Sequence, residues 1–459
     1  MNKGKVLYSK DAGTAGNEQS LTSILKQPVT AVQRRIILKQ RFYPILLSII
    51  LMVALFPPSV QAQPLIPIIR VGLLSNQDSV LISADTNFSI LDGETGQLVT
   101  ALVAGEKATI TVLGNDITIN GKVVKTEKIN TLMVQFKGDH YIQVNKKQYR
   151  GTIDIHLTRG KTGMTIVNRL PLEQYLYGVI AREMSPTWHL EALKAQSVAS
   201  RTYALYNLNK HQGDEYDVWA TTSNQVYGGR ESEVPQVIKA VDDTAGQVIM
   251  SQGKVISAYF HSSSGGYTEN SENVWGGYEP YLRGNVDYDQ NSPQYQWEKQ
   301  LTVNELTAIM AKAGYKIGTI KVIELAPLTS PPMSIPERGV SGRVKVMQLI
   351  GSTGSTQVSG EEIRKVLGLK SALFDVHVME SNLSPLHGQG SIINKPGIHQ
   401  MSGRPSETIL ISGFGWGHGL GLSQWGAKAM AEQGPQGDST YFKEILKHYY
   451  QGTTIKKVF

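Results

Sequence analysis

Short apolar runs rich in β-branched residues recur along the chain between residue 63 and about residue 168. Turn-forming pairs such as Asp92-Gly93 and Asn120-Gly121 separate several of these runs. Runs of this length between turn signals predict strands rather than helices. The expected strands cover residues 71–74, 80–83, 88–91, 109–113, 133–136, 151–157 and 164–168. This part of the chain is therefore predicted to be β-rich.

The pattern changes after residue 185, where small and apolar residues recur at the helical period. Ser185 can cap a helix, and Pro186 suits its first position. Alanines at positions 192, 195 and 199 then line one face. The spacing predicts a helix over residues 186–208 that packs closely against a neighbouring element.

Helical and strand patterns alternate in the remainder of the chain. Helices are expected over residues 303–313, 361–367 and 441–450, and strands over residues 255–260, 320–325 and 343–350. Residues 386–407 are rich in Gly, Ser and Pro and predict a loop. The predicted fold class is therefore α+β, with a β-rich N-terminal part followed by a mixed α+β lobe.

The N-terminal segment has the pattern of an export signal. Four basic residues at positions 34, 35, 39 and 41 precede the apolar run 45–56, and Val60-Gln61-Ala62 offers small residues for cleavage. The apolar run is shorter than the roughly 20 residues that a spanning helix needs. We therefore expect a signal peptide over residues 1–62 and an exported protein in the periplasm or cell envelope. An uncleaved anchor is the alternative, and the export route, general secretory or twin-arginine, stays open.

Charge and cysteine content narrow the classes of function. Residues 1–62 hold eight Lys/Arg and two Asp/Glu, so they account for +6 of the net charge of +7 and leave the mature part near +1. A nearly neutral body does not fit a nucleic-acid-binding protein. The chain has no cysteine, which excludes disulfides, thiolate zinc sites and Cys nucleophiles.

Glu183 is the first candidate for chemistry. It lies between the apolar run 175–180 and the expected helix start at Ser185, and its neighbours Met184 and Trp188 are bulky and apolar. A carboxyl group in such surroundings tends toward the raised pKa that a general acid requires. In the following helix, Glu191, Lys194 and Arg201 share a face, for which a solvated ion pair is the simpler interpretation.

Two segments rich in hydroxyl groups or glycine are candidates for ligand binding. Ser263, Ser264 and Gly265 follow a predicted strand and can present backbone N–H groups to a ligand, although an ordinary polar turn is the simpler interpretation. Trp275 and Tyr281 add rings that pack either on a sugar or in the core.

The second segment, residues 413–427, carries five alternating glycines from Gly413 to Gly421. Such glycines permit unusual φ/ψ angles and the close approach of a ligand. Its spacing fits neither a dinucleotide fingerprint nor a phosphate loop. His418 has two open interpretations, a ligand-binding residue or a structural histidine. Neither a metal site nor a cofactor is indicated by any spacing along the chain, which also lacks HExxH and GxSxG motifs.

Taken in order, these landmarks resemble the stage II sporulation protein D family, which includes the LytB amidase enhancers. The resemblance covers most of residues 145–459, and residues 63–144 match no family that we name. It rests on the segments 172–179, 182–184, 191–196, 201–204, 225–229, 263–266, 274–276, 280–282, 342–344, 417–421 and 423–426, together with Trp188 and Ala199.

The resemblance implies an activity on peptidoglycan glycan strands. Sporulation members of the family are lytic transglycosylases that act on strands stripped of peptides, and their catalytic Glu maps onto Glu183. Glu191 maps onto a second Glu tied to activity. A lytic transglycosylase needs only one carboxyl group, which first donates a proton and then accepts one. Some members bind zinc with help from cysteine, which this chain lacks.

We therefore expect a peptidoglycan lytic transglycosylase that forms 1,6-anhydro products, with a mixed α+β catalytic lobe. The alternative is a non-catalytic wall-binding protein that stimulates a cell-wall amidase, an N-acetylmuramoyl-L-alanine amidase. The expected substrate-binding residues are Glu191, Arg201, Ser263, Ser264, Gly265, Trp275, Tyr281, His418 and Gln424.

Overall fold

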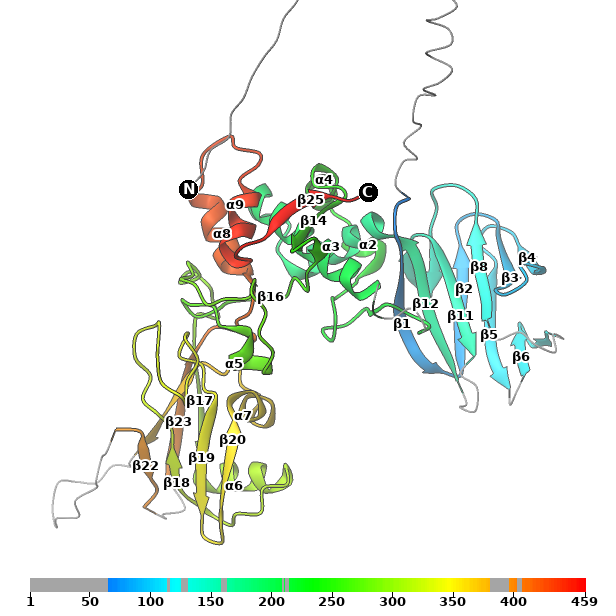
Figure 1. Cartoon of the computed structure of the whole chain (residues 1–459). Helices are drawn as coiled ribbons and strands as arrows, with labels where there is room; N and C mark the ends of the chain where they lie inside the picture. The colour runs from blue at the N-terminus through cyan, green and yellow to red at the C-terminus, as the bar shows by residue number, and fades with distance from the viewer. Residues whose placement is uncertain are drawn as a thin grey trace, which may run out of the picture. The chain divides into compact units, whose positions relative to one another are not determined.

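The computed structural model describes residues 65–113, 116–124, 131–157, 163–208, 210, 214–379, 396–402 and 407–459 (Figure 1). The predicted signal peptide 1–62 lies outside these residues. Residues Pro64–Phe459 form one compact unit. Within the described part of the chain, no helix combines the length and the apolar character needed to cross a membrane.

The N-terminal region contains two sheets whose strands are mostly antiparallel. The first has seven strands in the spatial order β13-β1-β12-β11-β8-β3-β4. Its strands are β1 (Ile68–Gln77), β3 (Phe88–Asp92), β4 (Leu98–Leu102), β8 (Thr131–Phe136), β11 (Thr152–Leu157), β12 (Met164–Pro171) and β13 (Val218–Trp219). The strand β13 joins in parallel to β1, and the other pairs are antiparallel.

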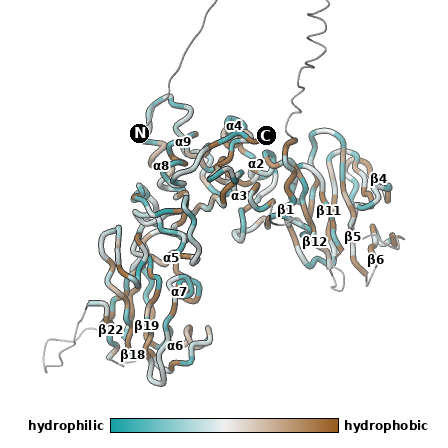
Figure 2. The backbone as a smooth tube through the Cα atoms, in the orientation of Figure 1, coloured by the Kyte–Doolittle hydropathy of each residue, from teal (hydrophilic) through white to brown (hydrophobic). Residues whose placement is uncertain are grey.

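The second sheet has six strands in the order β10-β9-β2-β5-β6-β7. They are β2 (Ser79–Ala84), β5 (Lys107–Leu113), β6 (Asp116–Ile119), β7 (Lys122–Val123), β9 (Ile142–Val144) and β10 (Lys147–Tyr149). Alternate residues are buried, for example Val80 and Ile82 in β2, as expected where one sheet face covers a core. These residues share an apolar core with Ile90 and Ile153 of the first sheet, and the apolar strands are visible in Figure 2.

A group of helices continues the same core. The group comprises α2 (Leu172–Glu183), α3 (Leu190–Leu208), η1 (Gly229–Ser232), α4 (Pro235–Asp243), α8 (Gln424–Gln433) and α9 (Phe442–Tyr449). Helix α3 packs against α2, α4, α8 and α9, and most of its side chains are buried. A small sheet, β14 (Gln247–Ser251), β15 (Lys254–Val255) and β25 (Thr454–Lys457), lies against α3.

Short elements follow this group. They are β16 (Phe260–His261), which pairs in parallel with β24 (Leu422–Ser423), and α5 (Ser271–Trp275). A second apolar core lies among residues 297–411. Its sheets are β17-β23-β21 and β20-β19-β18-β22. The elements are β17 (Gln296–Thr302), α6 (Val303–Lys312), β18 (Ile320–Glu324), β19 (Val346–Gly351), β20 (Ser355–Ser359), α7 (Gly360–Leu367), β21 (Phe374–Met379), β22 (Ile398–Gln400) and β23 (Thr408–Phe414).

The α+β class and the β-rich N-terminal part are confirmed, whereas three expected elements need correction. The helix expected from residue 186 begins at Leu190, because Ser185 instead bonds the Thr187 hydroxyl at 2.9 Å and accepts the Trp188 N–H in a turn. The strand expected over 255–260 is two short strands, β15 and β16. Strand β22 lies inside the expected loop 386–407, most of which is outside the described residues.

The predicted division between residues 144 and 145 falls in the hairpin of β9 and β10. Beyond it, β11 and β12 still belong to the first sheet. The boundary marks the point along the sequence where the family resemblance begins. Its position as a domain boundary stays a prediction.

Candidate active site

Helix α2 brings Glu183 to its position. The helix buries Tyr175, Leu176, Val179 and Ile180 against the core and ends at Glu183. Met184 then adopts an extended backbone, and its N–H donates to the Ile180 carbonyl at 2.9 Å. Glu183 therefore occupies the last turn of a helix whose apolar face is anchored in the core.

The carboxyl group of Glu183 contacts two segments that are distant in sequence. The Val226 N–H donates to its Oε1 at 3.1 Å, and the Gln424 side-chain amide donates to its Oε2 at 3.4 Å. Burial raises the pKa of Glu183, and these two hydrogen bonds oppose the rise. No ion pair to Glu183 is found among the described residues. A carboxyl group without a cation beside it is suited to carrying a proton.

The segment that holds Val226 is itself anchored to the helices. The buried Tyr175 hydroxyl donates to Gln225 Oε1 at 3.1 Å, and the Gln225 amide donates to the Ser200 carbonyl at 3.4 Å. The Asn224 amide donates to the Tyr203 hydroxyl at 3.2 Å. Gln225 and Val226 were not predicted as site residues, although both belong to one of the segments that carried the resemblance.

Aromatic rings gather near the two segments that meet at Glu183. On one side, the rings of Trp188 and Trp425 lie 4.9 Å apart between centroids. On the other, Tyr203 packs against Tyr259 at 5.9 Å, and Tyr259 packs against Trp275 at 4.5 Å. Trp275 is about half exposed (48%), and its predicted contact with a ligand stays a prediction.

His418 belongs to the same aromatic group. Its ring lies 5.0 Å from that of Trp275 and 5.3 Å from that of His261. The Leu420 N–H donates to His418 Nδ1 at 3.0 Å, and burial lowers the pKa of His418 to about 3. His418 is therefore neutral near neutral pH, and its position beside Trp275 keeps both interpretations of this residue open.

Glu191 and Arg201, both expected to bind substrate, are held in buried ion pairs. Glu191 Oε1 lies 2.9 Å from Lys194 Nζ, and Oε2 accepts the N–H of Phe442 at the start of α9 at 3.0 Å. The Arg201 guanidinium makes two bonds to Glu173, at 2.8 and 2.7 Å, and is fully buried. Both residues therefore join helices to one another, and a direct substrate contact by Arg201 has no geometric support.

The turn predicted to present N–H groups to a ligand uses them internally. The N–H groups of Gly265 and Gly266 both donate to Asp289 at 2.8 Å. The buried hydroxyl of Ser263 donates to Asp289, and that of Ser264 donates to Asp287. The geometry thus favours the simpler interpretation, a structural turn, for Ser263, Ser264 and Gly265.

The alternating glycines of the loop 413–421 have the expected backbone freedom but serve internal packing. Four of them, at 415, 417, 419 and 421, have φ between 65° and 120°. A Cβ at Gly419 would lie 2.3 Å from the buried Arg343 guanidinium, and one at Gly417 would lie 2.6 Å from His261. The close approach is therefore made by this chain's own side chains. Tyr281 is likewise buried, with its hydroxyl accepting the Ser257 N–H at 3.4 Å.

The glycine loop nevertheless brings a predicted residue to Glu183. The loop pairs with the Ser263 backbone through Trp416, continues into β24, and ends at Ser423, whose hydroxyl caps α8 by accepting the Gly426 N–H at 3.3 Å. Gln424 is the first residue of α8. Of the expected substrate-binding residues, Gln424 is the one for which a contact with Glu183 is observed.

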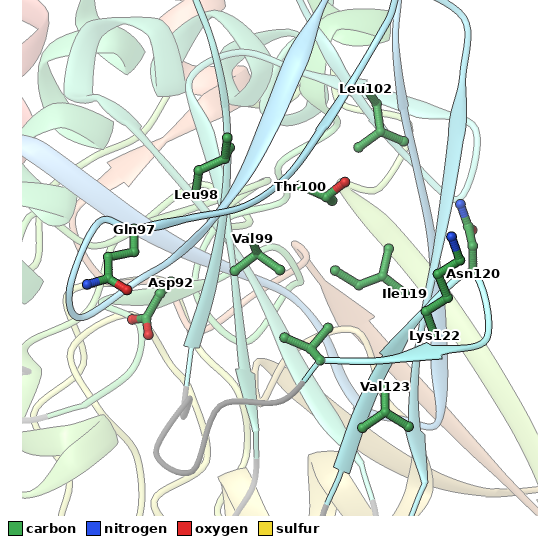
Figure 3. A pocket seen from close by; sticks show the side chains of 11 residues that line it. Asp92, Gln97, Leu98, Val99, Thr100, Leu102, Ile119, Asn120, Lys122 and Val123 are labelled. Atoms are coloured by element: carbon green, nitrogen blue, oxygen red, sulfur yellow. The ribbon is translucent and has the colours of Figure 1, made fainter.

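A pocket of about 480 Å³ is lined by residues of β4, β6 and β7, including Leu98, Ile119 and Val123 (Figure 3). Glu183 does not line this pocket. Throughout the described ranges, no cluster of three or more His, Asp or Glu side chains has the arrangement of a metal site.

Comparisons with known proteins give the family. The model of the family described as Stage II sporulation protein matches residues 160–250, which include Glu183. An uncharacterised protein of Brachyspira hyodysenteriae is 33% identical over 293 residues, covering 64% of this chain and 68% of that protein. The Stage II sporulation protein D of Bacillus subtilis is 29% identical over 313 residues, covering 65% of this chain and 78% of that protein. The chain belongs to the stage II sporulation protein D family.

Two further matches are to an amidase enhancer and to a domain of unknown function. The Amidase enhancer of Bacillus subtilis is 31% identical over 377 residues, or 74% of this chain. The match covers only about half (49%) of the enhancer's own length. A model for a domain of unknown function (DUF8618) matches residues 278–421, which include the second apolar core and most of the glycine loop.

Proposed function

We propose that this protein is an exported peptidoglycan lytic transglycosylase in which Glu183 is the single acid and base. The observation that carries the proposal is the state of the Glu183 carboxyl group. It is desolvated, its pKa is raised, and the donors that it bonds among the described residues are uncharged. The protein's membership of the stage II sporulation protein D family supports a role at the cell wall.

The first chemical step uses the protonated carboxyl group. Glu183 donates its proton to the glycosidic oxygen, and the bond between that oxygen and the anomeric carbon breaks. The leaving sugar keeps the proton, and positive charge develops at the anomeric carbon. The raised pKa favours the protonated form of Glu183 that this step requires.

The second step uses the carboxylate that remains. It accepts the proton of the C6 hydroxyl of the same sugar, whose oxygen then bonds to the anomeric carbon and closes a 1,6-anhydro ring. Glu183 regains its proton, so no water is consumed and no second carboxyl group is needed. This agrees with a site in which Glu183 contacts an N–H and an amide rather than another carboxylate.

Gln424 is proposed as a positioning residue for both steps. Its side chain can present either NH₂ or a carbonyl oxygen. The NH₂ group supports the carboxylate form of Glu183, and the carbonyl oxygen can accept the proton of the acid form. Val226 N–H stays bonded to the other carboxyl oxygen in either state.

The remaining assignments follow from the sequence and the family. We propose that residues 1–62 direct export, that residues 63–144 form an N-terminal region, and that residues 145–459 form the family domain, with the periplasm or cell envelope as destination. The partners are peptidoglycan glycan strands and no cofactor is proposed.

A second candidate function is a non-catalytic wall-binding protein that stimulates a cell-wall amidase. One finding favours it: a relative 31% identical to this chain is named Amidase enhancer. In that case Glu183 would be retained for binding rather than for proton transfer.

One experiment distinguishes the two functions. The purified protein and Glu183→Gln are each incubated with intact sacculi and with sacculi stripped of peptides, and released fragments are identified by mass spectrometry. A transglycosylase releases fragments with 1,6-anhydro ends, and the variant does not. Absence of cleavage in every substrate, together with stimulation of an added amidase by both proteins, would instead favour the binding protein.

A further inference from the structure

Two tryptophans belong to the two segments that position Glu183 and its partner Gln424. Trp188 is in the turn that follows α2, whose last residue is Glu183. Trp425 follows Gln424, whose amide contacts the Glu183 carboxyl group. Their rings meet at 4.9 Å with an interplanar angle of 63°. Both side chains are only partly buried, so each keeps surface that a ligand can cover.

A lysine on α8 joins this pair of rings. Lys428 Nζ lies 5.9 Å from the Trp188 centroid and 5.5 Å from the Trp425 centroid. Lys428 is one helical turn after Gln424, so the two side chains leave the same face of α8. Lys428 therefore places a positive charge over two indoles on the face of α8 that carries Gln424.

The charge of Lys428 is partly accessible to a ligand. Its partner is Glu432, at 2.7 Å and one further turn along α8; the Lys428 side chain is 21% exposed and the Glu432 side chain 49%. Partly exposed pairs of this kind contribute little to stability. The ammonium group has three N–H donors, and it can therefore bind a second carboxylate beside the first.

We propose that Trp188, Trp425 and Lys428 form a subsite for a sugar that carries a carboxylate. The inference rests on the proposed function and deepens it by naming a group that the site recognises. The rings provide apolar surface for a sugar face, and Lys428 provides the charge. In peptidoglycan, the lactyl group of N-acetylmuramic acid carries such a carboxylate where no peptide is attached, and an uncharged amide where one is.

Binding measurements in the Glu183→Gln background test the subsite without depending on cleavage. The probes are peptide-free glycan strands, the same strands with lactyl carboxylates converted to methylamides, and peptide-bearing strands. We expect the free carboxylate to bind about two- to fivefold more tightly than the methylamide, as one partly exposed charge pair provides. Adding Lys428→Gln should remove this difference by weakening only the binding of the free carboxylate.

Two matched variants serve as controls. Lys447→Gln removes a lysine of α9 that also pairs with a glutamate on its own helix, Glu444 at 2.7 Å, and should leave the preference unchanged. Glu432→Gln removes the competing carboxylate and should strengthen the binding of free-carboxylate strands.

Three outcomes would overturn the proposal. The first is equal binding of carboxylate and methylamide strands. The second is a preference that survives Lys428→Gln. The third is tight, Lys428-dependent binding of peptide-bearing strands, which would assign the recognised carboxylate to the peptide. Because binding is measured without cleavage, failure of the transglycosylase reaction leaves this test intact.

Discussion

Two glutamates on consecutive helices, Glu183 and Glu191, have opposite electrostatic surroundings. Glu191 is buried with Lys194 at 2.9 Å and the Phe442 N–H at 3.0 Å. Glu183 is partly buried beside aromatic rings and accepts only an N–H and an amide. Glu191 thus has a cation as its partner, whereas Glu183 has no cation partner among the described residues.

The presence or absence of a cation partner determines whether a buried carboxyl group serves the fold or can serve proton transfer. A buried carboxylate with a cation partner stays ionised and holds elements together, because removing either partner leaves an unpaired charge. A buried carboxyl group without such a partner is destabilised in its charged form, which raises its pKa. The α3 pairs Glu191–Lys194 and Glu173–Arg201 thus support the site, whereas Glu183 is in the state that proton transfer requires.

The largest effect is expected from Glu183→Gln. An amide cannot supply the proton, and general acid catalysis contributes about 10²–10⁴-fold. Release of anhydro-ended fragments from peptide-free sacculi should fall by that factor, with unchanged circular dichroism. Glu444→Gln, at an exposed pair, is the matched control, and retention of activity in Glu183→Gln would remove Glu183 from its role.

Arg201→Met should affect the fold rather than the chemistry. It leaves Glu173 without its two bonds from the guanidinium, and breaking a buried pair costs about 3–5 kcal/mol. Urea unfolding should show a loss of that size. If the variant is stable but inactive, Arg201 acts on substrate and its assignment as a structural residue is wrong.

Glu191→Gln should have a smaller effect. The amide can still accept the Phe442 N–H, and Lys194 keeps Asp243 at 3.3 Å, so we expect a loss of about 1–3 kcal/mol. Activity per folded molecule should stay within a few fold of the original. The family relationship implied a role for this residue in activity, and a loss of about a hundredfold without unfolding would restore that role.

The smallest effect is a pH dependence of stability. Burial raises the pKa of Glu183 above its ordinary value of 4.5, so the folded protein loses stability as the pH rises through the raised pKa. Glu183→Gln removes this loss. Its melting temperature should exceed that of the original protein at pH 8, and the difference should close near pH 4. A constant difference across this range would contradict the raised pKa.

Local patterns predicted much of the fold. Alternation and turn pairs identified the main strands of both N-terminal sheets, and the alanine spacing identified α3. The start of α3 was wrong because Ser185 and Trp188 form a turn instead. Helix α2 was not predicted, because it begins directly after the last residue of β12 and has no capping side chain at its N-terminus.

Only part of the candidate site could be proposed from the sequence. Glu183 was proposed from its apolar neighbours and from the family resemblance, and its catalytic role stays a prediction. Its partner Val226 contributes a backbone N–H, which no side-chain pattern indicates. The Ser263–Gly266 turn was uncertain because its fate depends on Asp287 and Asp289, more than 20 residues away. Such long-range pairings arise from topology rather than from local sequence.

The central claim is that one carboxyl group carries the reaction without water, and cleavage in ¹⁸O-labelled water tests it most directly. Peptide-free glycan strands are digested to completion, and the new sugar termini are examined by mass spectrometry. The account predicts 1,6-anhydro ends that contain no solvent oxygen, and no products with Glu183→Gln. One ¹⁸O atom at each new anomeric carbon would mean that water is the nucleophile and that a second carboxylate takes part, which would contradict the account.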